Sequence, residues 1–278
     1  MMDNMEEKKT GKLYIVGTPI GNLGDITVRA LEVLKSADLI ACEDTRHTLG
    51  LLTHFGIRKP LVSYYKPKEK EGAERILASL RRGDTVALVT DAGMPCISDP
   101  GALLVGRAVN EGIEVSSAPG PTAVTTAMAL SGICEPVFVF IGFLPPKKRD
   151  AIRVLERCAR AEATIALYSS PHSVNDDLAL IYEVLGARRV VTARELTKIY
   201  ESVEERELPF TIESPKGEYV LLVRSEEKRE DAPQGTLKEQ AEALISAGVP
   251  KKDAVKRVAR DNGVPKDEVY KLFIGREE

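Results

Sequence analysis

The sequence is poor in the residues that build cross-linked or metal-bound folds. Its 278 residues include four cysteines, at positions 42, 96, 134 and 158, and three histidines, at positions 47, 54 and 172. No two cysteines form a C-x-x-C pair, and the histidines are scattered. This spacing argues against a structural zinc site and against a disulfide framework. We therefore expect reduced, mostly buried thiols and no bound metal.

Long apolar runs are absent as well. The longest, such as residues 137–143, have the length of a strand, whereas a membrane-spanning helix needs about 18–20 apolar residues. The first ten residues are polar and charged, and they lack the apolar core and the cleavage pattern of a secretory signal. We expect a cytoplasmic protein that has no membrane partner.

A strong basic excess is also missing. The formal net charge is −3, whereas a markedly basic chain is typical of a protein that binds nucleic acid over much of its surface. Any contact with nucleic acid should therefore be local. The hydrophobic fraction of 43% is ordinary for a globular protein, and the length suffices for two compact domains.

Short β-branched runs alternate with helical patterns through the first 225 residues, which favours an α/β fold, and in the first block this alternation predicts a largely parallel sheet covered by helices. In a first block we expect strands at residues 13–16, 38–41, 61–62, 85–90 and 114–116, and helices at 27–36, 72–81 and 101–111. A second block, after an Ala-Pro-Gly-Pro interruption, has expected strands at 137–141, 164–168, 190–193 and 219–223, and helices at 122–130, 148–160 and 174–185. We predict two α/β domains, residues 11–118 and 119–225.

The last part of the sequence is purely helical in pattern and follows a polar linker. Within residues 236–276, the segment Gly248-Val-Pro-Lys is echoed by Gly263-Val-Pro-Lys, which predicts short helices joined by a tight turn, as in a helix-turn-helix. Residues 247–276 hold eight basic and four acidic residues. We expect Lys252 and Lys256 to contact phosphates there, although a solvated face of mixed charge would show the same composition.

Three loops, at residues 17–25, 91–101 and 118–123, each follow a predicted strand. Ligands of open α/β sheets lie outside the carboxyl ends of strands, so the loops are expected to converge. They hold Asp25, Asp91 and Asp99 but no lysine or arginine. This chemistry disfavours a phosphate and favours a cationic ligand such as S-adenosylmethionine, with glycines allowing close backbone approach. Alternatively, Asp91 and Asp99 cap turns and helices.

Four segments resemble the tetrapyrrole-methylase superfamily: Leu13-Tyr-Ile-Val-Gly-Thr-Pro-Ile-Gly-Asn-Leu-Gly-Asp-Ile-Thr27, Cys42-Glu-Asp-Thr-Arg-His-Thr48, Asp91-Ala-Gly-Met-Pro-Cys-Ile-Ser-Asp-Pro-Gly101 and Ala193-Arg-Glu-Leu-Thr-Lys198. Within it, they are similar to the branch that methylates the ribose 2′-oxygen of a cytidine in small-subunit ribosomal RNA. The resemblance implies S-adenosylmethionine in a cleft between two domains, a homodimer, and the RNA or the assembled small ribosomal subunit as partner. The helical tail matches the C-terminal module of that branch.

The resemblance also implies a set of cofactor contacts in the three loops and at one strand end. We expect these from Thr18, Pro19, Gly21, Asp91, Ala92, Gly93, Met94, Pro95, Ser98, Pro119, Gly120, Thr122, Ala123 and Tyr168. The chain departs from the family in one place, since Tyr168-Ser-Ser-Pro-His-Ser173 stands where members often have Tyr-Glu-Ser-Pro-His-Arg. If the glutamate and arginine position the substrate in other members, this chain must do so differently.

Methyl transfer to a ribose hydroxyl should be assisted by a base. The sequence leaves that base open among Glu43, Asp44, Glu195, Lys198 and His172, and we take Glu43, Glu195 and Lys198 as the catalytic candidates. Alternatively, Glu43 and Arg46 could form a local ion pair, and Arg194, Glu195 and Lys198 could form a structural salt bridge. The expected substrate contacts are Asp44, Arg46, Arg194, Lys252 and Lys256.

Two other functions fit parts of the sequence. A tetrapyrrole C-methyltransferase of the same superfamily would share the loops but would need no helical tail. A gene regulator with an α/β sensor domain would share the helix-turn-helix pattern, although the sparse charge of the tail argues against DNA binding.

Overall fold

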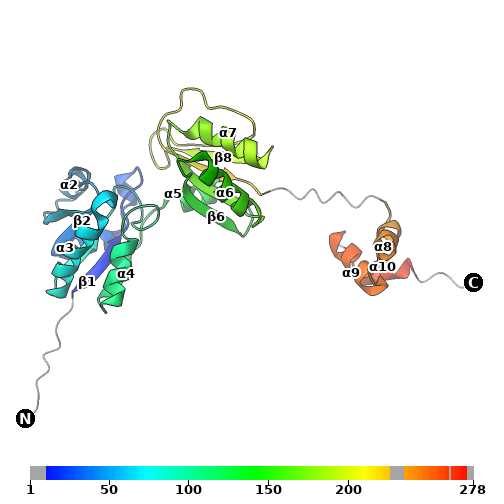
Figure 1. Ribbon diagram of the computed structural model, residues 1–278, viewed down its shortest axis with the longest axis horizontal. Coiled ribbons are helices and arrows are strands. Elements are labelled where there is room, and N and C mark those ends of the chain that lie inside the picture. The colour runs from blue at the N-terminus through cyan, green and yellow to red at the C-terminus, as the bar shows by residue number, and fades with distance from the viewer. Residues whose placement is uncertain (1–10, 226–234, 263, 274–278) are drawn as a thin grey trace, which may run out of the picture. The chain divides into compact units, whose positions relative to one another are not determined.

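The computed structural model describes residues 11–225, 235–262 and 264–273. The chain divides into two compact units, Met1–Ser225 and Glu226–Glu278 (Figure 1). The larger unit contains two five-stranded sheets, and the smaller one is helical. Among the described residues, no helix is long and apolar enough to cross a membrane. The predicted α/β class with a helical tail is confirmed.

The first sheet is parallel throughout, as predicted, and its strand order is β3-β2-β4-β1-β5. Parallel pairing brings the carboxyl ends of its strands, and the loops that follow them, to one edge. The strands are β1 (Lys12–Val16), β2 (Leu39–Cys42), β3 (Leu61–Ser63), β4 (Thr85–Leu88) and β5 (Glu114–Ala118).

Helices cover both faces of this sheet because residues alternate between faces along each strand. Leu13 and Ile15 of β1 pack against α3 (Glu69–Arg81) and α4 (Ala102–Asn110), whereas Val16 faces α1 (Val28–Ser36) and α2 (Thr45–His54). Each fully buried aliphatic side chain contributes roughly 1.5–3 kcal/mol. Two single-turn 3-10 helices, η1 (Leu23–Asp25) and η2 (Lys66–Lys68), complete the first half.

The second sheet is mixed, with the order β6-β7-β10-β8-β9. Only β6 and β7 are parallel in this sheet, and β10 runs antiparallel to both β7 and β8. Helix α5 (Ala123–Leu130) packs on one face, and α6 (Lys148–Ala159) and α7 (Val174–Leu185) pack on the other. The strands are β6 (Phe138–Phe143), β7 (Thr164–Ser169), β8 (Arg189–Arg194), β9 (Ser202–Glu207) and β10 (Tyr219–Val223).

Besides the two 3-10 helices, two elements of the larger unit were not predicted, α2 and β9. Helix α2 contains Gly50 and several threonines, which are weak helix formers, but the Asp44 side chain accepts a hydrogen bond from Arg46 N and caps its start. Strand β9 is largely charged, and it lies at the sheet edge, where charge discourages pairing with other chains.

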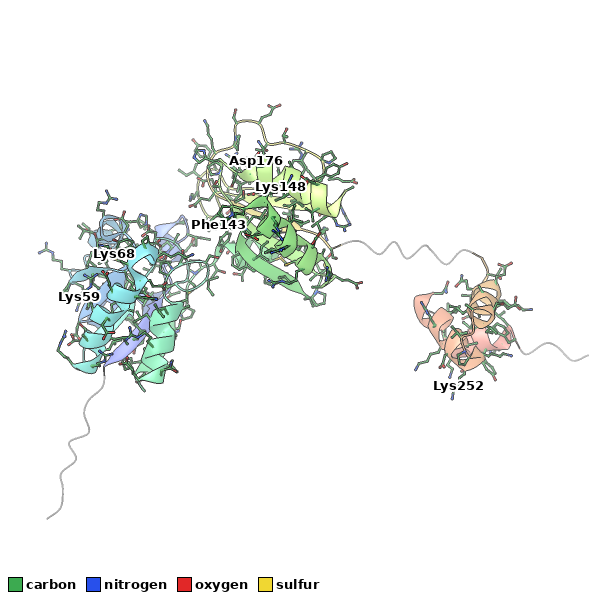
Figure 2. All side chains as sticks on the ribbon, in the orientation of Figure 1. Lys59, Lys68, Phe143, Lys148, Asp176 and Lys252 are labelled. Atoms are coloured by element: carbon green, nitrogen blue, oxygen red, sulfur yellow. The ribbon has the colours of Figure 1, made fainter. Side chains whose placement is uncertain are left out.

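The helical unit folds around its own small core. It comprises α8 (Leu237–Ser246), α9 (Lys251–Asp261) and α10 (Lys266–Lys271), and a capping box between Thr236 and Glu239 starts α8. The buried positions of α9 are Ala254, Val255, Val258 and Ala259. Its opposite face exposes lysines, including Lys252 on the outer side of the unit (Figure 2).

Candidate functional site

The first and second glycine-containing loops are joined by backbone hydrogen bonds. Thr18 N donates to Gly93 O at 2.9 Å, and Gly93 N donates to Thr18 O at 3.1 Å, which forms an isolated antiparallel bridge. The buried Thr18 hydroxyl also donates to Thr90 O at 3.1 Å. The loop after β1 is therefore fixed against the loop after β4, and their predicted convergence is confirmed.

The third loop meets the first where two glycines touch. Gly17 N donates to Ala118 O at 3.0 Å, so the chain of β5 runs beside that of β1 into this contact. A Cβ placed on Gly120 would lie 2.9 Å from Gly17 Cα, which is backbone and cannot rotate away. Only glycine permits this approach.

Replacing Gly120 by alanine is expected to destabilise the protein by about 1–3 kcal/mol, because the added methyl forces the two loops apart. The matched control is Gly106→Ala in α4, where nothing lies within 4 Å of the added Cβ. That change should stabilise the helix by about 0.5–1 kcal/mol. Urea denaturation of both variants measures the effects, and equal midpoints would contradict the tight contact.

The loop after β4 has an unusual backbone. Cys96 (φ 71°) and Ser98 (φ 75°) occupy the left-handed region that favours glycine. Such residues persist where surrounding contacts hold them, often at ligand sites. Here Gly101 N donates to Glu69 Oε1 at 3.1 Å, and the buried Tyr64 hydroxyl donates to the same oxygen. The start of α3 thus anchors the far end of this loop.

These loops form one side of a cavity of about 440 Å³, which we call the main cavity. This volume suits a small-molecule ligand. The other side comes from the second sheet and from α5. The lining residues are Ile20, Glu43, Thr90, Asp91, Ala92, Gly93, Met94, Ile97, Ser98, Asp99, Thr122, Ala123, Phe143, Tyr168, Ser169, Ser170, Pro171, Ala193, Leu196, Glu218, Tyr219 and Val220.

The charged side chains that line the main cavity all carry negative charge. Among the described residues that line it, four are acidic and none is lysine, arginine or histidine. Three of the acids have hydrogen-bond donors: Thr90 Oγ1 donates to Glu43 Oε2 at 3.2 Å, the backbone N of Asp44 donates to Asp91 Oδ1 at 3.3 Å, and Lys198, which lies outside the lining, donates to Glu218. A cation would be favoured there and an anion repelled.

Asp99 has the most perturbed carboxyl group in the cavity. Burial raises its pKa to about 6, and the nearby charges of Glu43 and Asp91 act in the same direction. The neighbouring Thr90 hydroxyl and the charge of Lys66 act to lower this pKa, but they offset the rise only in part. Burial together with like charge is the usual way in which a carboxyl group becomes a base near neutral pH.

An aromatic cluster forms another part of the cavity wall. The Tyr168 ring lies edge-on to Phe140 and Phe143, at centroid distances of 4.8 and 5.6 Å. Burial raises the pKa of Tyr168, so its hydroxyl stays protonated. Phe143, which is labelled in Figure 2, lines the cavity and is 58% exposed, so this wall reaches the solvent.

The residues expected from the sequence fall into two groups. Those lining the main cavity are Glu43, Asp91, Ala92, Gly93, Met94, Ser98, Thr122, Ala123 and Tyr168. Those outside its lining are Thr18, Pro19, Gly21, Pro95, Pro119, Gly120, Asp44, Arg46, Arg194, Glu195, Lys198, Lys252 and Lys256. Several of the second group support the loops instead, as Thr18 and Gly120 do.

Glu195 and Lys198 brace the turn between β8 and β9. Lys198 Nζ donates to Glu195 Oε1 at 2.8 Å and to Glu218 Oε2 at 3.0 Å, and Glu218 N donates to Glu195 Oε1 at 3.0 Å. The hydrogen bond from Lys198 lowers the pKa of Glu195. Burial acts to lower the pKa of Lys198, but its two carboxylate partners raise it overall. This brace places Leu196 in the cavity wall.

Asp44 and Arg46 form a local pair at the start of α2. Arg46 donates to the carboxylate from its backbone N at 2.8 Å and from Nη2 at 2.8 Å, and these bonds lower the pKa of Asp44 to about 2. The Arg46 side chain is 90% exposed. It is therefore accessible from solvent while the carboxylate caps the helix.

The departure from the family motif forms a small polar cluster. Ser169 Oγ donates to Asp177 Oδ2 of α7 at 2.5 Å, and Ser173 Oγ lies 3.3 Å from Ser169 Oγ. Burial raises the pKa of Asp177. A carboxylate from α7 thus satisfies the serines that stand in place of the family's glutamate and arginine.

Sequence reasoning did not select thirteen of the lining residues. Asp99, Ser169 and Ser170 belong to segments that were considered, whereas apolar residues such as Ile20 and Leu196 carry no chemical signal of their own. Their positions next to recognised motifs were the only available clue. The full set is Ile20, Thr90, Ile97, Asp99, Phe143, Ser169, Ser170, Pro171, Ala193, Leu196, Glu218, Tyr219 and Val220.

Comparison with known proteins decides the family. Residues 12–209 match the family model described as Tetrapyrrole (Corrin/Porphyrin) Methylases. The chain belongs to the tetrapyrrole methylase family. Solved structures with this methylase fold include diphthine synthase, at a TM-score of 0.60 and 15% identity over 77% of this chain and 89% of that one. Precorrin-6Y methylase from Archaeoglobus fulgidus reaches 0.52, at 21% identity over 78% and 100%.

Nearer relatives of this methylase match almost the whole chain. The ribosomal RNA small subunit methyltransferase I of Escherichia coli O157:H7 is 44% identical and covers 96% of each chain. The protein of the same name from Halalkalibacterium halodurans is 42% identical over 95% of this chain and 94% of its own. Within the methylases, the chain therefore belongs to the small-subunit methyltransferase I family.

Proposed function

We propose that this methylase transfers a methyl group from S-adenosylmethionine to small-subunit ribosomal RNA, at the 2′-oxygen of a cytidine ribose. The observation that carries the proposal is the main cavity, whose lining, within the described part of the chain, combines four carboxylates, no basic side chain and backbone held open by glycine. The names of the full-length relatives support ribosomal RNA as the substrate. The ribose 2′-oxygen and the cytidine come from the sequence resemblance.

The residues present fit the proposed cofactor. A sulfonium and an ammonium group are both cations, and the carboxylates of Asp91 and Asp99 face the cavity that would receive them. Met94, Ala123 and Tyr168 line the cavity with apolar surface, which can contact the uncharged parts of the cofactor. When bound, S-adenosylmethionine supplies a methyl carbon made electrophilic by its sulfonium.

The chain must align the acceptor hydroxyl and remove its proton. We assign the role of the base to Asp99, whose carboxylate oxygen would accept the proton. A base works best when its pKa lies near the operating pH, and the pKa of Asp99 is raised to about 6. Glu43 accepts a hydrogen bond from the Thr90 hydroxyl, and Asp91 accepts one from the backbone N of Asp44. Their role is to stabilise positive charge in the cavity.

The helical unit supports RNA as the acceptor. The lysines of α9 that we expected to contact phosphates, Lys252 and Lys256, are exposed on the face opposite its buried side. Relatives named for ribosomal RNA cover 96% and 95% of the chain, whereas the two solved methylases of other names cover 77% and 78%. We propose that α9 binds RNA phosphates.

Domain boundaries and assembly are part of the proposal. We place the domains at residues 11–118, 119–225 and 236–276, and we propose a homodimer. Ile199 and Tyr200 are 95% and 72% exposed at the β8–β9 turn, and neighbouring exposed apolar side chains often mark an interface. Sedimentation velocity tests this assembly, and a monomer at micromolar concentration would contradict it.

Methyl transfer can be measured directly. The protein is incubated with methyl-labelled S-adenosylmethionine and either methyl-deficient small ribosomal subunits or their naked RNA, and the RNA is digested to nucleosides. We expect label on a cytidine ribose. A parallel incubation with a porphyrinogen tests the tetrapyrrole alternative. Label on the porphyrinogen, or on a base rather than a ribose, would overturn the proposal.

A further inference from the structure

A second cavity lies across the second sheet from the main cavity. Successive residues of β8 point to opposite faces, so Ala193 lines the main cavity while Thr192 and Arg194 line the second one. Its volume is about 300 Å³, and we call it the rear cavity. It is lined by Thr192, Arg194, Ser202, Glu204, Arg206, Thr211, Ile212, Glu213 and Tyr219.

Arg194 is the notable member of this lining. Its Nε is buried and has no hydrogen-bond partner among the described residues. A buried guanidinium donor without an acceptor is costly, since each such group loses its hydration. The adjacent Glu195 contributes a favourable charge but no hydrogen bond to this Nε, and its Oε1 accepts from Lys198 and from the backbone of Glu218. The side chain therefore has a donor available for a ligand.

Further donors surround the same space. Arg206 supplies a second positive charge to the rear cavity. Its guanidinium carbon lies 4.4 Å from the centroid of the Phe210 ring, and this contact holds the side chain in place. The Tyr219 hydroxyl accepts a hydrogen bond from Lys216 N at 3.3 Å, which leaves its own proton to donate. Ser202 and Thr211, which also carry hydroxyls, belong to the same lining.

These donors suit an acceptor-rich anion with a single negative charge. Two arginines and several hydroxyls match the oxygens of a phosphate group. Glu204 and Glu213 line the same cavity, and their charges oppose a second negative charge on the ligand. A phosphodiester carries one charge, whereas free phosphate near neutral pH carries more.

We propose that the rear cavity binds a backbone phosphodiester of the RNA strand whose ribose enters the main cavity. The inference rests on the function proposed above. Tyr219 connects the two sites because it lines both cavities, and it pairs with Arg194 across the β10–β8 ladder. Arg194 ends β8 and Tyr219 begins β10, so an RNA strand that spans the two cavities would pass around this end of the sheet. The phosphate contact would hold the nucleotide while the chemistry occurs on the other face.

The test compares Arg194→Met with Arg75→Met in the full-length protein. Arg75 is an exposed arginine of α3 that lines neither cavity, so its replacement removes the same charge. We expect Arg194→Met to raise the KM for RNA roughly tenfold or more, with kcat at saturating RNA and the Kd for S-adenosylmethionine unchanged. The slope of log Kd for RNA against log salt should fall by about 0.7, the loss of one single-strand phosphate contact. Arg194→Lys should restore the slope but only part of the affinity.

Failure of the proposed function can be distinguished from failure of the rear-cavity proposal. If the wild-type protein methylates no RNA, the proposed function fails, whatever Arg194 does. If the wild type is active and Arg194→Met has the KM and salt slope of Arg75→Met, the rear-cavity proposal is wrong. Titration with dimethyl phosphate and with inorganic phosphate, followed by NMR of the arginine Nε–H groups, needs no RNA. Preference for inorganic phosphate, with unchanged RNA affinity in the variant, would assign the cavity to a free anion and overturn the proposal.

Discussion

Replacing Asp99 by asparagine is expected to lower the turnover of methyl transfer by about 10²–10⁴-fold, the usual contribution of a positioned base. Asparagine keeps the size of the side chain but cannot accept the proton of the acceptor hydroxyl. Single-turnover methylation with saturating cofactor and RNA measures the step directly. The control is Asp176→Asn, which removes an exposed carboxylate of α7 outside the main cavity (Figure 2). Equal rates in the two variants would exclude Asp99 as the base.

The pH dependence of the wild type provides an independent check. The active form of a base is the deprotonated one, so kcat/KM for the cofactor should rise with pH and level off above the pKa of about 6. The value of kcat should reach its plateau at lower pH, because a bound cation favours the carboxylate. In Asp99→Asn both rises should disappear. A profile unchanged by the substitution would place the titration on another group.

Deprotonation of Asp99 should lower the stability of the fold, although it raises the activity. Its pKa is raised on folding, so its contribution to stability is fully present below the unfolded pKa and is lost as pH increases through about 6. Asp99→Asn should therefore be more stable than the wild type at pH 8, and the difference should shrink toward pH 4. Thermal denaturation at the two pH values measures this. A loss of stability at both would indicate a purely structural role.

Replacing Asp91 by asparagine is expected to weaken S-adenosylmethionine binding by roughly 10–100-fold, the effect of losing one charge-assisted contact. The substitution is chosen because Oδ1 of asparagine still accepts the hydrogen bond from Asp44 N. Stability should therefore change little. Isothermal titration calorimetry measures the affinity, and an unchanged Kd would remove Asp91 from the cofactor site.

S-adenosylhomocysteine serves as the matched ligand for this variant, since it keeps the ammonium and lacks the sulfonium. If the Asp91 carboxylate faces the sulfonium, the substitution should weaken S-adenosylmethionine more than S-adenosylhomocysteine. An equal loss for both ligands would place Asp91 at the ammonium or at the ribose hydroxyls. A greater loss for S-adenosylhomocysteine would contradict any contact with the sulfonium.

Much of the larger unit follows from local signals in the sequence. The buried strands of the first sheet consist of apolar runs, and turn residues follow each of them, so their parallel arrangement could be predicted. The three loops could be brought together because parallel strands end at one edge. Helix α2 escaped notice for a physical reason: the aspartate that caps it was interpreted as a substrate contact, and its interior has weak helix formers.

The second side of the main cavity was harder to predict. Tyr168 was recognised through a motif, but Leu196 comes from the β8–β9 turn and Val220 from β10, and their approach depends on antiparallel pairing across β10. Sequence periodicity does not specify which distant strands pair. The interpretation of Glu195 and Lys198 as catalytic candidates had the same weakness, because their partner Glu218 lies on a segment with no evident connection to them.

The alternation along β8 restricts how this protein can change in evolution. One strand supplies Ala193 to the main cavity and Arg194 to the rear cavity. A deletion or insertion of a single residue in β8 would exchange the two side chains between faces. It would put an arginine into the acidic cavity and remove the donor from the other. Relatives that vary in length should therefore do so in the β8–β9 turn or beyond, and the two cavities should be inherited together.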